Sequence, residues 1–406
     1  MQRQTVIQWG VALLCGCILA ACSVAERKHA IPDAQLQQAE IAGMTDVRYI
    51  PSTKAGVKAY LQEIQQAVAR RPADTGRQSN LLALSGGGDN GAFGAGLLVG
   101  WSQRGDRPKF DQVTGISTGA LIAPFAFLGT DYDPTLKALF TEVRPEDIYR
   151  ERGKLGILLT DAMADVSPLR ALVDKTVDTM MLQKIAAEYE QKGRLLLIGT
   201  TNIDSGSLVL WNMGRIAAQA SPAAHALFKN VMLASAAVPG AFPPVLFDAE
   251  INGRDYHELH VDGGLAVQVY LYPAAVSRAA FQAGIIKSRQ REAYIIRNAR
   301  LSIGWEETER NGLGILGRSY KKMVQSQGLG NLYQIYEITR RDKVGFNLAY
   351  IGNDFEQPHP AEFDQPYMNA LFEYAYEKAK RGYPWQHVPP GLEQSSEEDL
   401  ALVERQ

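Results

Sequence analysis

Apolar runs of strand length alternate with segments of helical pattern over residues 79 to about 300. Four mainly apolar runs are predicted as buried strands, at residues 80–84, 110–114, 194–202 and 293–296. Helical segments follow the first two of these runs, at residues 92–101 and 118–127. Near-continuous apolar strands that alternate with helices are typical of a parallel sheet covered on both faces. The pattern therefore predicts an α/β fold, with a mostly parallel central sheet sandwiched by helices in three layers.

The two ends of the chain are more polar than this central part. One helix is predicted at residues 54–70, where Arg71-Pro72 ends it. Near the other end, helical stretches at residues 320–336 and 366–381 precede a polar tail. We divide the chain into a leader (1–21), an N-terminal tether with one helix (22–78), an α/β domain (79–300) and a C-terminal helical extension (301–406).

A serine stands between glycines directly after the second predicted strand. Gly115-Ile116-Ser117-Thr118-Gly119 fits the Gly-x-Ser-x-Gly pattern of a nucleophile elbow, in which a strand enters a tight turn and a helix leaves it. Glycines are needed there because the serine backbone is strained and a neighbouring Cβ would clash. Pro124 should kink or end the helix that follows.

The first predicted strand runs into a glycine-rich loop, Ser85-Gly86-Gly87-Gly88, which precedes a helix. Unpaired N–H groups at a helix N-terminus favour negative charge, so this loop could hold an oxyanion. No Gly-Lys-Ser/Thr follows the glycines, which argues against a P-loop. The spacing from Gly86 to Gly91 also fits Gly-x-Gly-x-x-Gly, so a dinucleotide-binding loop remains open.

A serine nucleophile needs a base, and Asp262 is the preferred candidate. It follows an apparent strand at residues 259–261, and Gly263-Gly264 leave its carboxylate room for close approach by another loop. His260 lies two residues earlier and would share a strand face with Asp262, so it remains an alternative base.

These three pieces, in this order along the chain, resemble the patatin-like phospholipases, which are serine acyl hydrolases with a Ser-Asp dyad. The Pro-rich stretch at residues 234–245 also resembles the segment before the aspartate strand in that family, and the resemblance covers roughly residues 79–300. It implies that Ser117 is the nucleophile and Asp262 its proton acceptor. It further implies an oxyanion hole made by backbone N–H groups of the loop glycines, Gly86, Gly87 and Gly88.

The resemblance implies a membrane lipid or another ester as substrate, and residues 79–300 as the catalytic domain. Two positions depart from the family pattern: Asn90 stands where many members carry Arg or Lys, and Ser85 replaces the usual leading Asp. Neutral esters and glycerolipids therefore stay open beside anionic phospholipids. The same acyl-enzyme could also make the protein an acyltransferase. An alternative from another class is a lipoprotein that binds lipid or a partner without catalysis.

The first residues resemble a bacterial lipoprotein signal. Arg3 precedes an apolar stretch, and Leu19-Ala20-Ala21-Cys22 resembles a lipobox. The resemblance implies cleavage after Ala21 and lipidation of Cys22, which anchors the chain in a membrane. Ser23 is not the aspartate of inner-membrane retention, so we expect the outer membrane of a bacterial cell envelope, facing the periplasm.

Composition excludes few other classes. The net charge of −2 gives no indication of nucleic-acid binding. There is no His/Cys motif at metal-ligand spacing, so we expect no metal and no cofactor. The apolar segments 155–159 and 162–166 are hypothesised to wall an acyl pocket. The sequence leaves the oligomeric state, the head-group preference and the preferred acyl position open.

Overall fold

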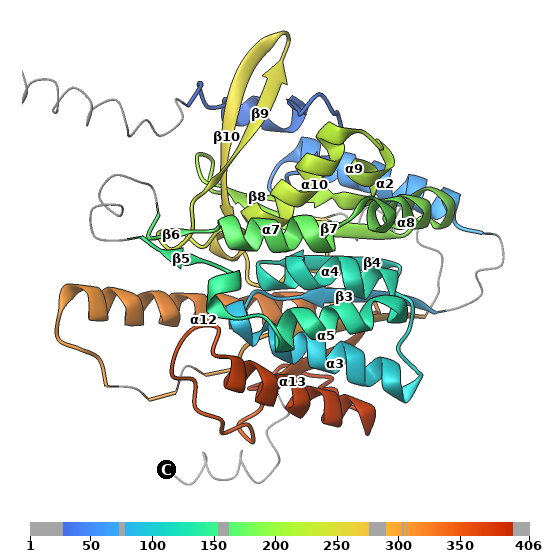
Figure 1. The fold of residues 1–406 in the computed structure, drawn as a ribbon. Coiled ribbons are helices and arrows are strands. Elements are labelled where there is room, and N and C mark those ends of the chain that lie inside the picture. Colours follow the sequence, from blue (N-terminus) through green and yellow to red (C-terminus); the bar gives the residue numbers. More distant parts are fainter. Residues whose placement is uncertain are drawn as a thin grey trace, which may run out of the picture.

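The computed structural model describes residues 27–72, 78–152, 162–275, 290–302, 304–305 and 307–392. Its centre is a sheet in which five neighbouring strands are parallel (Figure 1). In spatial order these are β7 (Leu195–Asn202), β4 (Gln112–Ile116), β3 (Ser79–Leu84), β11 (Arg291–Arg297) and β12 (Gly345–Tyr350). The predicted α/β fold with a mostly parallel central sheet is therefore confirmed.

Antiparallel strands extend the sheet beyond β7. They are β10 (Arg254–Asp262), β9 (Val245–Ile251), β1 (Glu40–Ile41), β8 (Ser207–Asn212) and β2 (Arg48–Tyr49). β7 and β8 form the hairpin that the turn residues 204–206 predict. A separate two-stranded sheet joins β5 (Arg150–Glu151) to β6 (Ala164–Asp165).

The alternation of side chains along β3 divides the core between the two faces of the sheet. Leu82 and Leu84 belong to the largest buried cluster, whereas Ala83 belongs to a second cluster on the other face. The first face is covered mainly by α3 (Gly91–Arg104), α4 (Thr118–Leu128), α5 (Asp133–Thr141), α8 (Thr179–Lys192), α10 (Pro222–Ser235) and α13 (Gln365–Lys380). The second is covered by α12 (Gly312–Arg341) and α2 (Lys54–Arg70).

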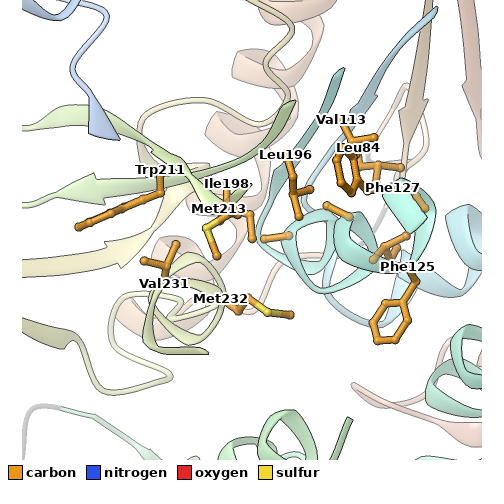
Figure 2. Packing of buried hydrophobic residues seen from close by; sticks show 14 of the residues in the cluster. Leu84, Val113, Phe125, Phe127, Leu196, Ile198, Trp211, Met213, Val231 and Met232 are labelled. Atoms are coloured by element: carbon orange, nitrogen blue, oxygen red, sulfur yellow. The ribbon is translucent and has the colours of Figure 1, made fainter. Parts of the chain in front are cut away.

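Figure 2 shows how the first face is packed: Leu84 and Val113 lie together with Phe127 of α4, and Ile198 lies beside Met213. Two shorter helices, α7 (Ser167–Thr176) and α9 (Met213–Ala218), complete this side. Single 3₁₀ turns lie at Asp33–Gln38, Gly88–Asn90, Thr130–Tyr132, Pro145–Asp147 and Gly263–Leu265.

Three expectations need correction. The residues before α2 are more than a tether, because β1 and β2 pair with the main sheet. The C-terminal part has the expected helices, α12 and α13, but it also contains β12, which was not predicted and which extends the parallel sheet beside β11. Helix α4 continues through Pro124 to Leu128 instead of ending there. In the first case backbone hydrogen bonds to the sheet override a polar local composition, whereas β12 is itself a mainly apolar run of strand length.

Some predictions fall outside the described residues. They concern the leader with Cys22, and residues 155–159, which were expected to form part of the pocket wall. Among the helices that the structure does describe, none combines the length and the hydropathy needed to cross a bilayer. The domain boundaries and the lipid anchor stay predictions.

Candidate active site

Ser117 occupies the sharp turn between β4 and α4. Its backbone has φ +54° and ψ −126°, a left-handed conformation that side-chain-bearing residues rarely adopt. A Cβ at Gly115 would lie 2.5 Å from the carbonyl oxygen of Gly119, and a Cβ at Gly119 would lie 2.4 Å from that of Leu84. Both glycines are therefore required by space, and the turn has the backbone geometry predicted for a nucleophile elbow.

The sheet register places Asp262 beside this serine. On β7, Gly199 pairs with Ile116 at the end of β4, and the next residue, Thr200, pairs with Asp262 at the end of β10. The two strands run in opposite directions along the same edge of β7, so their carboxyl ends meet. Ser117 follows this meeting point directly, and its Oγ donates a hydrogen bond of 2.6 Å to Oδ2 of Asp262.

Burial makes Asp262 a stronger base than an ordinary aspartate. Its residue is 5% exposed, and desolvation raises its pKa to about 7, although hydrogen bonds from Ser117 and the Gly264 N–H act in the opposite direction. A second Ser-Asp pair provides a contrast. Ser167 Oγ donates to Asp165 at 2.7 Å on the surface, and there the pKa of the carboxyl is lowered, first by that hydrogen bond. A short hydrogen bond from a serine therefore does not by itself raise the pKa of an aspartate; burial is also needed.

Ser235, at the end of α10, holds the backbone of the nucleophile Ser117 in place. Its Oγ accepts a hydrogen bond from the Ser117 N–H at 3.0 Å and donates one to the Gly199 carbonyl at 2.6 Å. Ser235 thus ties the turn to β7. Sequence reasoning noted the stretch that begins at Ala234 but gave Ser235 no role. Its only signal was its place within that stretch.

The glycine loop lies against Ser117, and it changes one part of the prediction. A Cβ on Gly86 would be 3.0 Å from the Ser117 Cβ, so the loop does border the nucleophile. However, the Gly86 N–H donates to the carbonyl of Gln268 at 3.0 Å and cannot also hold an oxyanion. Within the described residues, the N–H groups of Gly87 and Gly88 have no such protein acceptor. The candidate oxyanion hole is therefore narrowed to Gly87 and Gly88.

Asn298, just beyond β11, fixes this loop and was not predicted. Its N–H donates to Ser85 Oγ at 2.8 Å, and its side-chain amide donates to the Ser85 carbonyl at 2.9 Å. Its Oδ1 accepts from the Gly94 N–H in α3. Ser85 therefore serves as an anchor point for the loop.

The dyad opens into a large cavity of about 930 Å³, a size that suits a lipid-like ligand. Its apolar wall includes Leu121, Ile148, Leu169, Val238 and Phe242. From the segment 162–166, Met163 and Ala164 line this cavity. Its other wall carries cationic side chains, among them Arg297 and Arg300.

Comparison with known proteins agrees with this geometry. The family model described as patatin-like phospholipase matches residues 82–274. Those residues are a patatin-like phospholipase domain. The family is one of lipid acyl hydrolases, and its match replaces the dinucleotide-binding interpretation of the glycine loop. No curated protein sequence matches the chain.

Among solved structures, VipD from Legionella pneumophila is similar to the chain with a TM-score of 0.38 and 11% sequence identity. The match covers 88% of this chain and 71% of VipD.

The alternative base, His260, is held away from the serine in this patatin-like domain. It is fully buried, with Nδ1 2.7 Å from Thr200 Oγ1 and Nε2 2.9 Å from Glu258 Oε2. Glu258 in turn pairs with the buried Arg48. Both ring nitrogens are therefore occupied within a structural network, and His260 is rejected as the base.

A group of possible metal donors forms where the C-terminal loop meets the glycine loop. Asp89, His359 and Glu362 place one donor atom each within 4.8 Å of one another. His359 Nε2 is already 2.7 Å from Asp89 Oδ2, which also accepts the Phe363 N–H. These bonds give the group a structural role in joining the two loops. The expectation of no metal stays a prediction.

Proposed function

We propose that the protein is a serine acyl hydrolase that cleaves acyl esters of membrane lipids through Ser117 and Asp262. The observation that carries this proposal is the 2.6 Å hydrogen bond from the strained serine to a buried carboxylate whose pKa is raised to about 7. A base with a pKa near the working pH combines a usable deprotonated fraction with a useful proton affinity.

The reaction follows from the positions of these groups. Asp262 takes the Ser117 proton as Oγ attacks the ester carbonyl carbon, and the Gly87 and Gly88 N–H groups hold the oxyanion. Asp262 then gives the proton to the leaving alcohol as the ester C–O bond breaks. Water, deprotonated by Asp262, attacks the acyl-enzyme, and Asp262 returns this proton to Ser117 Oγ as the bond between Oγ and the acyl carbon breaks, which releases a fatty acid and free serine. Transfer of the acyl group to an alcohol is the alternative second step, and product analysis separates it from hydrolysis.

A serine-directed fluorophosphonate probe tests the nucleophile. We expect it to label the wild-type chain and to leave Ser117→Ala unlabelled, because the probe needs an activated hydroxyl. Ser167→Ala is the matched control, since it removes the serine of the exposed Ser-Asp pair and should label normally. A folded wild-type chain that hydrolyses no ester and takes no label would instead favour a binding lipoprotein.

Exposed apolar side chains near the cavity mouth favour a lipid over a soluble ester. Ile315, Leu316, Tyr320 and Met323 are 44–70% exposed on the first turns of α12, which project beyond the sheet (Figure 1). Leu316, Tyr320 and Met323 share one helix face by their spacing, and Tyr320 also lines the cavity. Such a face suits the surface of a bilayer. We propose that it complements a membrane anchor at lipidated Cys22 in the outer membrane.

Replacing two of these residues should separate membrane from soluble substrates. We expect Leu316→Ser combined with Met323→Ser to lower turnover of phospholipid vesicles about tenfold, because each lost apolar contact weakens adsorption. Hydrolysis of dissolved p-nitrophenyl butyrate should not change. Met180→Ser, which alters a methionine that is 60% exposed on α8, is the control. Equal vesicle turnover in all these proteins would refute the role of α12.

A further inference from the structure

One buried arginine beside the catalytic loop has no acidic partner among the residues that the structure describes. Arg297 ends β11 and is only 2% exposed, yet its guanidinium bonds to neutral groups, the Gln325 amide oxygen at 2.8 Å and the Arg300 carbonyl at 3.3 Å. Within the described residues, no carboxylate lies within ion-pair distance of it. A buried charge without a counter-charge is strongly unfavourable.

Other buried arginines of this chain do have acidic partners. Arg48 pairs with Glu258, Arg107 with Asp133 at 2.9 Å, and Arg194 with Glu188 at 2.8 Å. Arg297 differs from them in its place as well, because it lines the cavity that also contains Ser117. Burial lowers the pKa of Arg297 to about 10, and no charge among the described residues acts in the other direction.

The sheet places this cation next to the oxyanion loop. Ile296 pairs with Leu84 on β3, so Arg297 is level with Ser85, and the following Asn298 is the residue that anchors the loop. Gly328 of α12 leaves space for the guanidinium, since a Cβ there would lie 2.0 Å from Nη1 of Arg297. The absence of a side chain at Gly328 therefore allows α12 to pack closely against the guanidinium of Arg297.

A second arginine adds to the same wall. Arg300 also lines the cavity, and its guanidinium donates to the carbonyls of Gly352 (2.9 Å) and Phe355, again neutral acceptors. Asn90 in the glycine loop itself is neutral, and its side chain bonds to Tyr367 and the Gly87 carbonyl. This chain therefore has cations beside the oxyanion loop, but they come from the end of β11.

We propose that Arg297, assisted by Arg300, forms a subsite for the phosphate of a glycerophospholipid whose acyl ester lies at Ser117. Arginine forms strong, charge-assisted hydrogen bonds with phosphate oxygens, and a bound phosphate would supply the missing counter-charge. The inference rests on the proposed acyl hydrolase function and specifies its substrate class. It makes Arg297 a specificity residue that acts on the head group and takes no part in proton transfer.

The test compares two substrates with identical acyl chains in the same mixed micelles, phosphatidylcholine and diacylglycerol. We expect Arg297→Gln to lower kcat/KM for phosphatidylcholine by about ten- to a hundredfold, the usual range for loss of a charge-assisted hydrogen bond. The value for diacylglycerol should stay within about twofold, since that lipid has no phosphate. Arg297→Lys should restore part of the loss. Arg340→Gln, at an exposed position of α12, controls for charge at the micelle surface.

The outcomes are distinguishable. Equal losses on both lipids would assign Arg297 a purely structural role, and no loss on either would also overturn the subsite. If Arg297→Gln does not fold, Arg300→Gln must show the same selective loss for the subsite to stand. A wild-type chain that hydrolyses diacylglycerol but not phosphatidylcholine refutes the subsite alone, whereas hydrolysis of neither lipid refutes the proposed function.

Discussion

Asp262→Asn should lower kcat/KM for ester hydrolysis by about a thousandfold and leave the protein folded. Asparagine has the same shape, and its single amide oxygen can still accept the Gly264 N–H, but the amide NH₂ then faces Ser117 Oγ as a donor and cannot take its proton. The measurement is steady-state hydrolysis by the full chain. Asp165→Asn alters the exposed Ser-Asp pair and should keep wild-type activity. A value for Asp262→Asn above one tenth of wild type would exclude Asp262 as the base.

The pH profile gives this prediction a second readout. Because the pKa of Asp262 is raised to about 7, the wild-type rate should rise tenfold per pH unit below about 7 and level off above it. The residual activity of Asp262→Asn should lack this limb.

Stability should move in the opposite direction from activity. A carboxyl whose folded pKa lies above its unfolded value of 3.8 stabilises the fold at low pH, and this stability is lost as the pH rises through about 7. Asp262→Asn should therefore raise the melting temperature at pH 8, where the wild type buries a negative charge.

The sequence was sufficient for features that depend on local chemistry. Strand β3, helix α2 and the Gly-x-Ser-x-Gly turn follow from apolar runs, a proline stop and glycines, and the structure has all three. These features were predictable because neighbouring residues determine them. The sequence favoured Asp262 over His260, but excluding His260 needed the structure, since both lie on β10 and only their partners distinguish them.

The rest of the site depends on contacts between distant residues. Ser235 reaches Ser117 across 118 positions, and Asn298 reaches Ser85 across 213. No local pattern marks either residue, because each is a single polar side chain in an ordinary segment. The same reason applies to Arg297, whose significance lies in the absence, among the described residues, of a carboxylate within ion-pair distance of its guanidinium. The Gly86 N–H is likewise removed from the candidate oxyanion hole by a distant contact, because it donates to the Gln268 carbonyl of another loop.

The tight contact between Asn298 and Gly87 leads to the second large effect. A Cβ on Gly87 would lie 2.1 Å from the Asn298 carbonyl oxygen, which is backbone and cannot turn aside. Gly87→Ala must therefore push the loop away from Asn298 and move the Gly87 and Gly88 N–H groups from the oxyanion position. Loss of an oxyanion donor typically lowers kcat by about a hundred- to a thousandfold, and we expect a decrease of that order.

Measuring kcat together with the melting temperature separates this effect from unfolding. Gly330→Ala is the matched control: nothing lies within 4 Å of the Cβ that it would add on α12, so activity should not change. Alanine also favours helix more than glycine does, so that variant should be at least as stable as the wild type. If Gly87→Ala keeps kcat within about threefold of wild type, the Gly87 and Gly88 amides do not stabilise the oxyanion. The proton transfer between Ser117 and Asp262 would then have to proceed with another group facing the developing charge.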